Sequence, residues 1–420
     1  MFIILMLILG IRVLYSDMKK IPKRDHIEVK MLCVLYLFLM FYYVSYINNL
    51  PFSYGYGIPG ADMLQHFLGA TALASGSKWT DLAIIATRFE KVGISTIGYF
   101  LYTSFIALCI YFPPVFSVGF NIYLIYVFQI LISLDTCLKF AILISSEYKT
   151  VRTIQIFTIL ALCVPYIVQA SQLMRDVYYM WAIVSCLSAI QQHRWEQGRP
   201  GRGNGDKFFK LKVSFFFILS VVIRYYSFIV LVPLICYYSG KERLAVYITM
   251  AEVMVLLVGT NIVNFVKIAV GLPWNITAPD IAESIKFLLF PNIFNQSSYL
   301  WHWTQQFGTT IDVSGCNVPG VYYMMAVWNL YTFPLILIGI CTQWKHKKRE
   351  IIIWTGILLS VVMLYSITYD SIDTRHKFFM SLPMCVLSAK GAAVLQKYIP
   401  LVLYKIFIFM AVVFILFAAI

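Results

Sequence analysis

Long apolar stretches recur along this chain, and short basic clusters separate them. Several of the stretches approach 20 residues, the length that a helix needs to cross the roughly 30 Å hydrocarbon core of a bilayer. Hydrophobic residues make up 60% of the 420 residues, charged residues only 12%, and the mean hydropathy is +0.78. We therefore predict an all-α fold: a polytopic transmembrane bundle of about 11–13 membrane helices. A single integral membrane domain is expected over residues 1–420.

The basic clusters predict the orientation of this bundle. They lie at Lys19–Lys30, Glu147–Arg152, His193–Lys212, Lys241–Arg243 and Lys345–Glu350. Lysine and arginine concentrate in cytoplasmic loops, so these five loops are predicted to be cytoplasmic, including a flexible Gly/Arg-rich loop at about 193–212. Orientation also explains the net charge of +14 without a nucleic-acid partner.

The apolar runs between the clusters predict the individual spans. We expect them at about 2–16, 31–47, 117–146, 152–170, 177–192, 245–266, 321–343, 351–367, 376–390 and 400–420. The first run lacks a basic leader, so it is expected to be a membrane helix and not a cleaved signal peptide. The stretch 212–238 begins and ends beside basic loops, which predicts two short helices that turn near Arg224.

Two larger segments are predicted on the outer side, at about 48–114 and about 267–320, each carrying short helices. Counting crossings requires that the apolar segment 96–112 does not span. We expect it to dip into the outer leaflet and turn back at Pro113-Pro114, because consecutive prolines break a helix. The nine cysteines show neither disulfide nor metal-ligand spacing, so no metal ligands are predicted from the residues.

The first outer segment carries Asp62 and His66, four residues apart within a stretch of helical spacing. Residues at this spacing share one face of a helix. The Asp62 carboxylate could accept a proton from a sugar hydroxyl or orient it, with His66 beside the substrate. The alternative is that Asp62 is simply an acid in the first helical turn, where it stabilises the helix dipole.

Arg175 and Asp176 stand next to each other where an outer turn leads into a span. Such a pair could hold a phosphate and steer a hydroxyl, and a helix cap with an interface anchor is the alternative.

Some charged residues interrupt apolar stretches, among them Arg224, Asp135 and Lys139. Arg224 at membrane depth costs at least ~2.5 kcal/mol on insertion scales, so it indicates function or pairing. At the tip of the predicted hairpin it could bind a lipid phosphate through two hydrogen bonds, and snorkelling to the interface is the alternative. Asp135 and Lys139 are four residues apart in one span and predict a structural ion pair, with a proton or ion relay as the alternative.

The remaining candidate site residues lie in a late outer turn and in the second outer segment. Asp373, Arg375 and His376 lie together in the turn, where Arg375 is a natural second phosphate ligand and His376 a hydrogen-bond donor, unless the turn is merely charged. Trp301 and Trp303 could stack on sugar rings or anchor the loop at the membrane interface.

In this order, the segments resemble the GT-C-type polytopic membrane glycosyltransferases. Four features match. The first is an Asp before a helical A..L..G pattern (Asp62, Ala70, Leu73 and Gly76), and the second is a Pro and an aromatic residue before a polar stretch that ends in Asp (Pro165, Tyr166 and Asp176). The third is a basic residue at a hairpin tip (Arg224), and the fourth is a late Arg that leads into a Pro-containing helix with small residues at its end (Arg375, Pro383, Ala389 and Gly391). In its Arg175–Asp176 pair, the chain also resembles membrane proteins of bacterial surface-polysaccharide gene clusters, including Wzy-type repeat-unit polymerases.

The resemblance implies transfer of a sugar or oligosaccharide from a polyprenyl (pyro)phosphate to an acceptor on the outer face of a bacterial inner membrane. Asp62 and Asp176 would be the catalytic residues. The residues that would bind substrate are His66, Arg175, Arg224, Asp373, Arg375, His376, Trp301 and Trp303. A divalent cation is the one cofactor left open. The expected partners are the polyprenyl-linked donor, a glycan or lipid-linked acceptor, membrane lipids and other polysaccharide-assembly proteins.

Two other functions stay open beside a transferase of this kind. A repeat-unit polymerase of O-antigen, capsule or exopolysaccharide uses the same carrier chemistry with a larger acceptor. A flippase or transporter of lipid-linked glycans belongs to a different class, and transporters often show inverted repeats around a midplane site. The chain shows no internal repeat.

Overall fold

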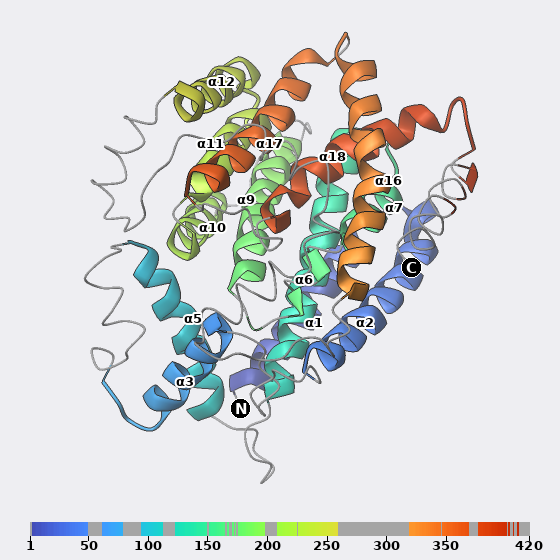
Figure 1. Ribbon diagram of the computed structural model, residues 1–420. Coiled ribbons are helices and arrows are strands. Elements are labelled where there is room, and N and C mark those ends of the chain that lie inside the picture. The colour runs from blue at the N-terminus through green and yellow to red at the C-terminus, as the bar shows by residue number, and fades with distance from the viewer. Residues whose placement is uncertain are drawn as a thin grey trace.

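The described part of the chain is entirely helical. The computed structural model describes residues 2–48, 61–78, 94–111, 122–148, 151–163, 166–167, 170–171, 173, 175–197, 208–224, 226–258, 319–345, 347–368, 377–400, 402–403, 406 and 410. Within these ranges there are thirteen α-helices, one short 3-10 helix and no strand, which confirms the predicted all-α class (Figure 1). The helices are α1 (Phe2–Met18), η1 (Lys23–Asp25), α2 (His26–Asn48), α3 (Ala61–Ala74), α5 (Ile94–Tyr111), α6 (Ile122–Glu147), α7 (Thr153–Ala161), α9 (Asp176–Gln197), α10 (Phe209–Ile223), α11 (Ser227–Tyr238), α12 (Glu242–Val258), α16 (Pro319–Gln343), α17 (Lys348–Thr368) and α18 (Lys377–Leu395).

Two of these helices, α6 and α18, are long and apolar enough to cross a membrane when only the described residues are considered. Several others are shorter: α1 and α12 have 17 residues, α10 has 15 and α11 has 12. A helix rises 1.5 Å per residue, so these four reach only about 18–26 Å, against a hydrocarbon core of roughly 30 Å.

One predicted span is wrong in its extent. The run 152–170 was expected to be a single helix, but α7 ends at Ala161 and Leu162 is its C-cap. The sequence has proline at position 165. In a helix, a proline ring clashes with the carbonyl of the residue four positions earlier and supplies no N–H for a hydrogen bond to it. For Pro165 that residue is Ala161. The expected break near Arg224 is present, because α10 ends at Ile223 and α11 begins at Ser227.

The pair α16 and α18 is the most extensively packed in the described part of the chain. Backbone approaches backbone closely here: a Cβ on Gly339 would lie 2.3 Å from the carbonyl oxygen of Leu387, and one on Gly391 would lie 1.8 Å from that of Leu335. Small residues of this kind let membrane helices come into direct contact. This contact lies in the second half of α18, and the first turns of that helix reach the site described below.

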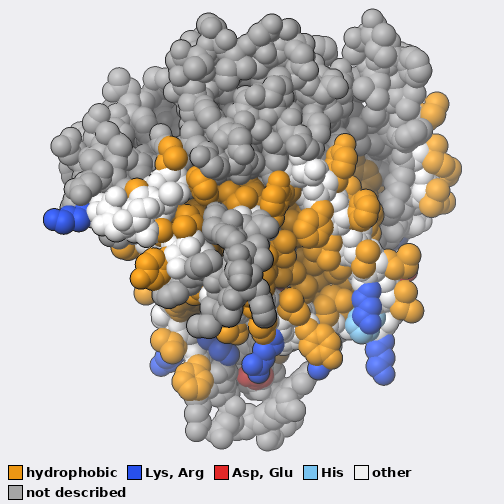
Figure 2. All heavy atoms as spheres, turned by 90° about the horizontal axis from the view of Figure 1, so that it is seen from below, with side chains coloured by type: hydrophobic (Ala, Val, Ile, Leu, Met, Phe, Trp, Pro, Cys, Tyr) orange, Lys and Arg blue, Asp and Glu red, His pale blue; other side chains and the backbone are white. Residues whose placement is uncertain are grey.

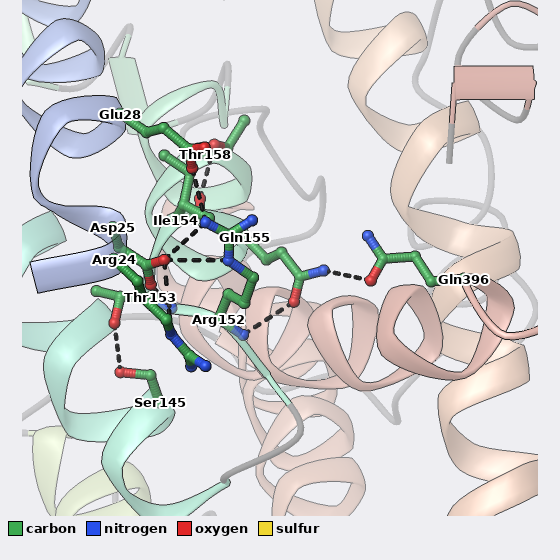
Figure 3. Close-up of polar contacts among 10 residues, drawn as sticks. All are labelled: Arg24, Asp25, Glu28, Ser145, Arg152, Thr153, Ile154, Gln155, Thr158 and Gln396. Atoms are coloured by element: carbon green, nitrogen blue, oxygen red, sulfur yellow. Dashed lines mark hydrogen bonds and ion pairs between the residues drawn. The ribbon is translucent and has the colours of Figure 1, made fainter. Parts of the chain in front are cut away.

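At one end of the bundle, an ion pair joins the buried Asp25 of η1 to the exposed side chain of Arg152, the N-cap of α7 (Figure 3). Arg152 donates to Oδ1 of Asp25 through Nε at 3.0 Å and Nη2 at 2.7 Å, and the Thr153 backbone N–H donates to Oδ2 at 3.2 Å. The pKa of Arg152 is raised by the hydrogen bond to Asp25. Gln155 then donates to Gln396 at 2.8 Å, which adds the end of α18 to the same region (Figure 3).

The other basic loops meet at this end as well. The Tyr148 ring lies under two ammonium groups, 4.7 Å from Nζ of Lys347 and 4.0 Å from Nζ of Lys390. Lys390 is ion-paired with Glu350. The Arg349 guanidinium lies 3.5 Å from the Glu242 carboxylate. The hydroxyl groups of Tyr148 and Tyr237 lie 3.2 Å apart. The rings of His193 and Phe209 are stacked, with their centroids 3.8 Å apart. The structure therefore gathers the described parts of all five basic loops at one end of the bundle, which we call the basic end.

Apolar side chains face outward on the surface of the bundle. On α2, Met31, Val34, Phe38 and Tyr42 recur at helical spacing and are all more than 60% exposed, for example Phe38 at 76%. Figure 2 shows a broad area of hydrophobic side chains over the described surface, with most Lys and Arg side chains toward the lower edge of that view. Contiguous apolar faces of this size are unusual on monomeric soluble proteins and mark contact with a membrane or a partner.

Candidate functional site

The candidate site lies where α9 begins and α10 ends. These two helices pack closely side by side. Their other ends meet at the basic end, where His193 stacks on Phe209. Helix α9 has 22 residues and is therefore about 33 Å long. From the contact between His193 and Phe209, Asp176 lies about 26 Å away along α9 and Arg224 about 22 Å away along α10. Helices α3 and α5 lie beside this region, far from the turn between α16 and α17 in Figure 1.

An ion pair joins the two helices at this point. Nε and Nη2 of Arg224 both lie 2.6 Å from Oδ1 of Asp176. The Asp176 side chain is 3% exposed and that of Arg224 17%. Arg224 also caps α10, since its backbone N–H donates to the carbonyl of Ser220 at 2.9 Å. The residue predicted at the tip of a helical hairpin is thus the residue that ends α10.

A second guanidinium, that of Arg175, lies beside the first. Arg175 is 3% exposed, and its guanidinium carbon lies 3.6 Å from the centre of the Tyr99 ring. Burial and the neighbouring charge of Arg224 lower the pKa of Arg175. An arginine nevertheless stays charged in proteins, so two cations occupy one buried region. Repulsion between them favours an anion at this position.

His66 of α3 closes one side of the region. Nδ1 of His66 shares a hydrogen bond with Oγ1 of Thr103 at 2.9 Å, and the imidazole is stacked on the Tyr99 ring with centroids 5.1 Å apart. The edge of the Tyr102 ring meets the imidazole at 4.9 Å. The Tyr102 hydroxyl donates to Oε1 of Gln129 at 3.4 Å, which ties α5 to α6. The buried imidazole of His66 and the guanidinium of Arg175 therefore share one aromatic partner, Tyr99.

Aromatic rings from three elements form a further wall. The Phe379 ring of α18 lies 5.8 Å from the guanidinium carbon of Arg224. Tyr179 and Tyr226 both meet Phe379 edge to face, at 5.3 Å and 5.8 Å. Aromatic planes suit the apolar faces of sugar rings and the first units of a prenyl chain. The described site thus combines cations, one carboxylate, an imidazole and aromatic rings.

The structure brings four of the predicted site residues together: His66, Arg175, Asp176 and Arg224. Asp62 lies one turn before His66 in α3, and its side chain is outside the described residues. Asp373, Arg375, His376, Trp301 and Trp303 also lie outside the described residues. The sequence suggested that the neighbours Arg175 and Asp176 act as a pair. In the structure, the Asp176 carboxylate of α9 instead accepts a hydrogen bond from Arg224 at the end of α10.

Several residues of this site were missed at the sequence level, above all Gly98, Tyr99, Tyr102 and Thr103 of α5. A signal was available. Tyr99, Tyr102 and Thr103 are spaced i, i+3 and i+4, which places three polar groups on one face of an otherwise apolar helix. Phe379 carries no such signal, because an aromatic residue in an apolar run is ordinary core.

The described residues provide no set of metal ligands, since no group of three or more His, Cys, Asp or Glu residues comes together among them. In the candidate site, Asp176 is the carboxylate that the structure describes, and its Oδ1 accepts from Arg224.

A separate charged cluster lies midway along α6. Lys139 is ion-paired with Asp135 and lies 3.5 Å from Oδ2 of Asp17 of α1, and Nε1 of Trp181 donates to Oδ2 of Asp135 at 2.7 Å. Lys20 donates to Asp17 at 2.6 Å. The negative charges of the two carboxylates equal the positive charges of the two ammonium groups. This cluster agrees with the predicted structural ion pair and extends it to α1 and α9.

Comparison with family models, curated proteins and solved structures finds no match to this chain.

Proposed function

We propose that the chain is a multi-pass membrane glycosyltransferase. It moves a sugar or oligosaccharide from a polyprenyl (pyro)phosphate to an acceptor on the outer face of a bacterial inner membrane, in the assembly of a cell-surface polysaccharide. The single observation that carries this proposal is the pair of adjacent, largely buried guanidinium groups of Arg175 and Arg224 with one carboxylate between helices α9 and α10. Arginine recognises phosphate through two parallel N–H···O bonds, and burial strengthens each of them.

The surroundings of the arginines support a lipid-borne phosphate in preference to a free one. The outward apolar faces of the bundle fit contact with lipid tails. Helix α10 has 15 residues, so Arg224 lies about 22 Å from the start of that helix at the basic end, and a hydrocarbon core is roughly 30 Å thick. This depth suits a headgroup drawn slightly below the outer interface while its prenyl chain stays in the bilayer.

The proposed reaction is a displacement at the anomeric carbon. The acceptor oxygen forms a bond to that carbon, and the bond from the carbon to the phosphate oxygen breaks. The electron pair leaves with the polyprenyl (pyro)phosphate, whose growing negative charge Arg175 and Arg224 stabilise. The acceptor hydroxyl proton passes to the carboxylate of Asp62, and the anomeric configuration inverts.

The role of Asp176 in this scheme is to position Arg224. Its carboxylate already accepts two N–H groups from Arg224 on a single oxygen, so the arginine occupies that oxygen. Removal of the acceptor proton is therefore assigned to Asp62, one turn from His66. The imidazole of His66, which shares a hydrogen bond with Thr103, is assigned to the acceptor side of the site.

The lipid-linked glycans of cells with and without the protein test this proposal. In cells lacking the protein, an intermediate one sugar shorter than the full unit accumulates on the carrier if the protein is a transferase. Unchanged lipid-linked and surface glycans would rule the proposal out. An undiminished pool that is displaced to the inner leaflet would instead identify a flippase.

A repeat-unit polymerase is the second candidate. The Arg175–Asp176 pair, which is similar to that of polysaccharide polymerases, lies in the centre of the described site and supports it. Polymerases use the same carrier chemistry, with a second lipid-linked oligosaccharide as acceptor. Accumulation of complete, single repeat units on the carrier would favour the polymerase over the transferase.

A further inference from the structure

Helix α5 approaches the candidate site so closely that one of its positions has no room for a side chain. A Cβ on Gly98 would lie 2.4 Å from the carbonyl oxygen of Val222 and 2.9 Å from that of Ile223. The same Cβ would lie 2.7 Å from Nη1 of Arg175. Backbone atoms cannot give way cheaply, so any larger residue here must push α5 away from the end of α10. That end is followed directly by Arg224.

The next residue fixes the plane of the second guanidinium. The Tyr99 ring is 7% exposed and lies 3.6 Å from the guanidinium carbon of Arg175. A guanidinium stacked on an aromatic face keeps its N–H groups in its own plane, where they can still bind oxygens. Because Tyr99 also stacks on His66, it sets the spacing between the arginines and α3.

We propose that Gly98 and Tyr99 of α5 are positioning residues, which hold the guanidinium groups of Arg175 and Arg224 at the separation that a lipid phosphate requires. This inference rests on the proposed function and adds two residues to it. Neither residue donates to the substrate. Gly98 lets the backbone of α5 reach the end of α10, and Tyr99 orients Arg175.

The chain offers a matched control for simple packing. A Cβ on Gly339 would lie 2.3 Å from the carbonyl oxygen of Leu387, which is as close as the approach at Gly98. This contact joins α16 to α18 and involves no charged group. Gly339→Ala therefore reports the cost of separating two helices, and Gly98→Ala reports that cost together with any displacement of the arginines.

Binding of farnesyl phosphate to the purified full-length chain in detergent tests the proposal. Farnesyl phosphate carries the phosphate and the first prenyl units of a carrier. The variants are Gly98→Ala, Tyr99→Leu, Tyr99→Phe and Gly339→Ala, with Arg175→Ala and Arg224→Ala for reference. Each is measured for its dissociation constant and its melting temperature, at equal concentrations of folded protein.

We expect Gly98→Ala and Tyr99→Leu to weaken binding roughly tenfold, equivalent to about 1.4 kcal/mol. Tyr99→Phe keeps the ring and should retain most of the affinity. Gly339→Ala should lower the melting temperature and leave the affinity of the folded protein unchanged. Wild-type affinity in Gly98→Ala and Tyr99→Leu, while the arginine variants lose binding, would overturn this inference and leave the proposed function standing. Equal losses in Gly98→Ala and Gly339→Ala would also overturn it. A wild-type chain that does not bind farnesyl phosphate would overturn both.

Discussion

Arg224 at the end of α10 and Asp176 at the start of α9 share a buried ion pair, with Nε and Nη2 of the arginine each 2.6 Å from the same carboxylate oxygen. The pair joins the helix of the predicted span 177–192 to the first of the two short helices predicted in 212–238. In the proposed function it also couples substrate binding to stability, because a buried charge that loses its partner is costly. Mutations at Arg224 therefore have to be interpreted together with Asp176.

Arg224→Ala is expected to abolish glycan assembly and to destabilise the protein by about 3 kcal/mol, since it removes two charge-assisted hydrogen bonds from the buried Asp176 carboxylate. The double variant Arg224→Ala with Asp176→Asn removes the charge as well as its partner. It should recover most of the lost melting temperature without recovering glycan assembly. Recovery of assembly in the double variant would show that Arg224 serves stability alone.

Asp62→Asn is expected to abolish glycan assembly while the amount of protein in the membrane stays at the wild-type level. The amide keeps the size of the side chain and removes the carboxylate that we propose as the acceptor of the hydroxyl proton. Asp62→Glu keeps a carboxylate on a longer side chain and should retain measurable activity. Surface polysaccharide and membrane-protein level in cells that carry each variant provide the measurement. Normal polysaccharide with Asp62→Asn would refute the assignment of the base.

Asp25→Asn is expected to destabilise the basic end by about 2–3 kcal/mol, because the buried carboxylate accepts from both the Arg152 side chain and the Thr153 backbone. Glu28→Gln is the control. Glu28 also pairs with Arg152, at 2.9 Å, but its side chain is 53% exposed, so its loss should cost about 0–1 kcal/mol. Thermal unfolding in detergent compares the two. An equal effect of both variants would mean that burial of Asp25 contributes little.

The positions of most helices could be predicted from the apolar runs. The run 117–146 corresponds to α6 (Ile122–Glu147), and the run 177–192 to α9 (Asp176–Gln197). The run 152–170 failed because proline at 165 interrupts it, a local signal that outweighs hydropathy. How many helices cross a membrane is not a property of hydropathy alone, since helices such as α10 are too short to span unaided.

The site was predictable only in part. Charged residues are scarce here, so Arg175, Asp176 and Arg224 stand out, and the structure joins them. The pairing of Arg224 with Asp176 depends on how α9 and α10 pack, which no single sequence specifies. Gly98 was missed for the same reason: its importance comes from the carbonyl of Val222, which is more than a hundred residues away along the chain.

Cysteine labelling in intact cells tests the orientation that places the candidate site on the outer side. Ser77 and Ser239 are both exposed, Ser77 just after α3 on the side of His66 and Ser239 between α11 and α12 at the basic end. An impermeant thiol reagent should label Ser77→Cys in intact cells and label Ser239→Cys only after the cells are permeabilised, because basic loops stay in the cytoplasm. The wild-type chain, whose described cysteines include the exposed Cys341, supplies the background signal. The opposite labelling pattern would put the arginine pair on the cytoplasmic side of the membrane. The sugar donor would then have to be one that is activated in the cytoplasm, in place of a polyprenyl-linked sugar in the outer leaflet.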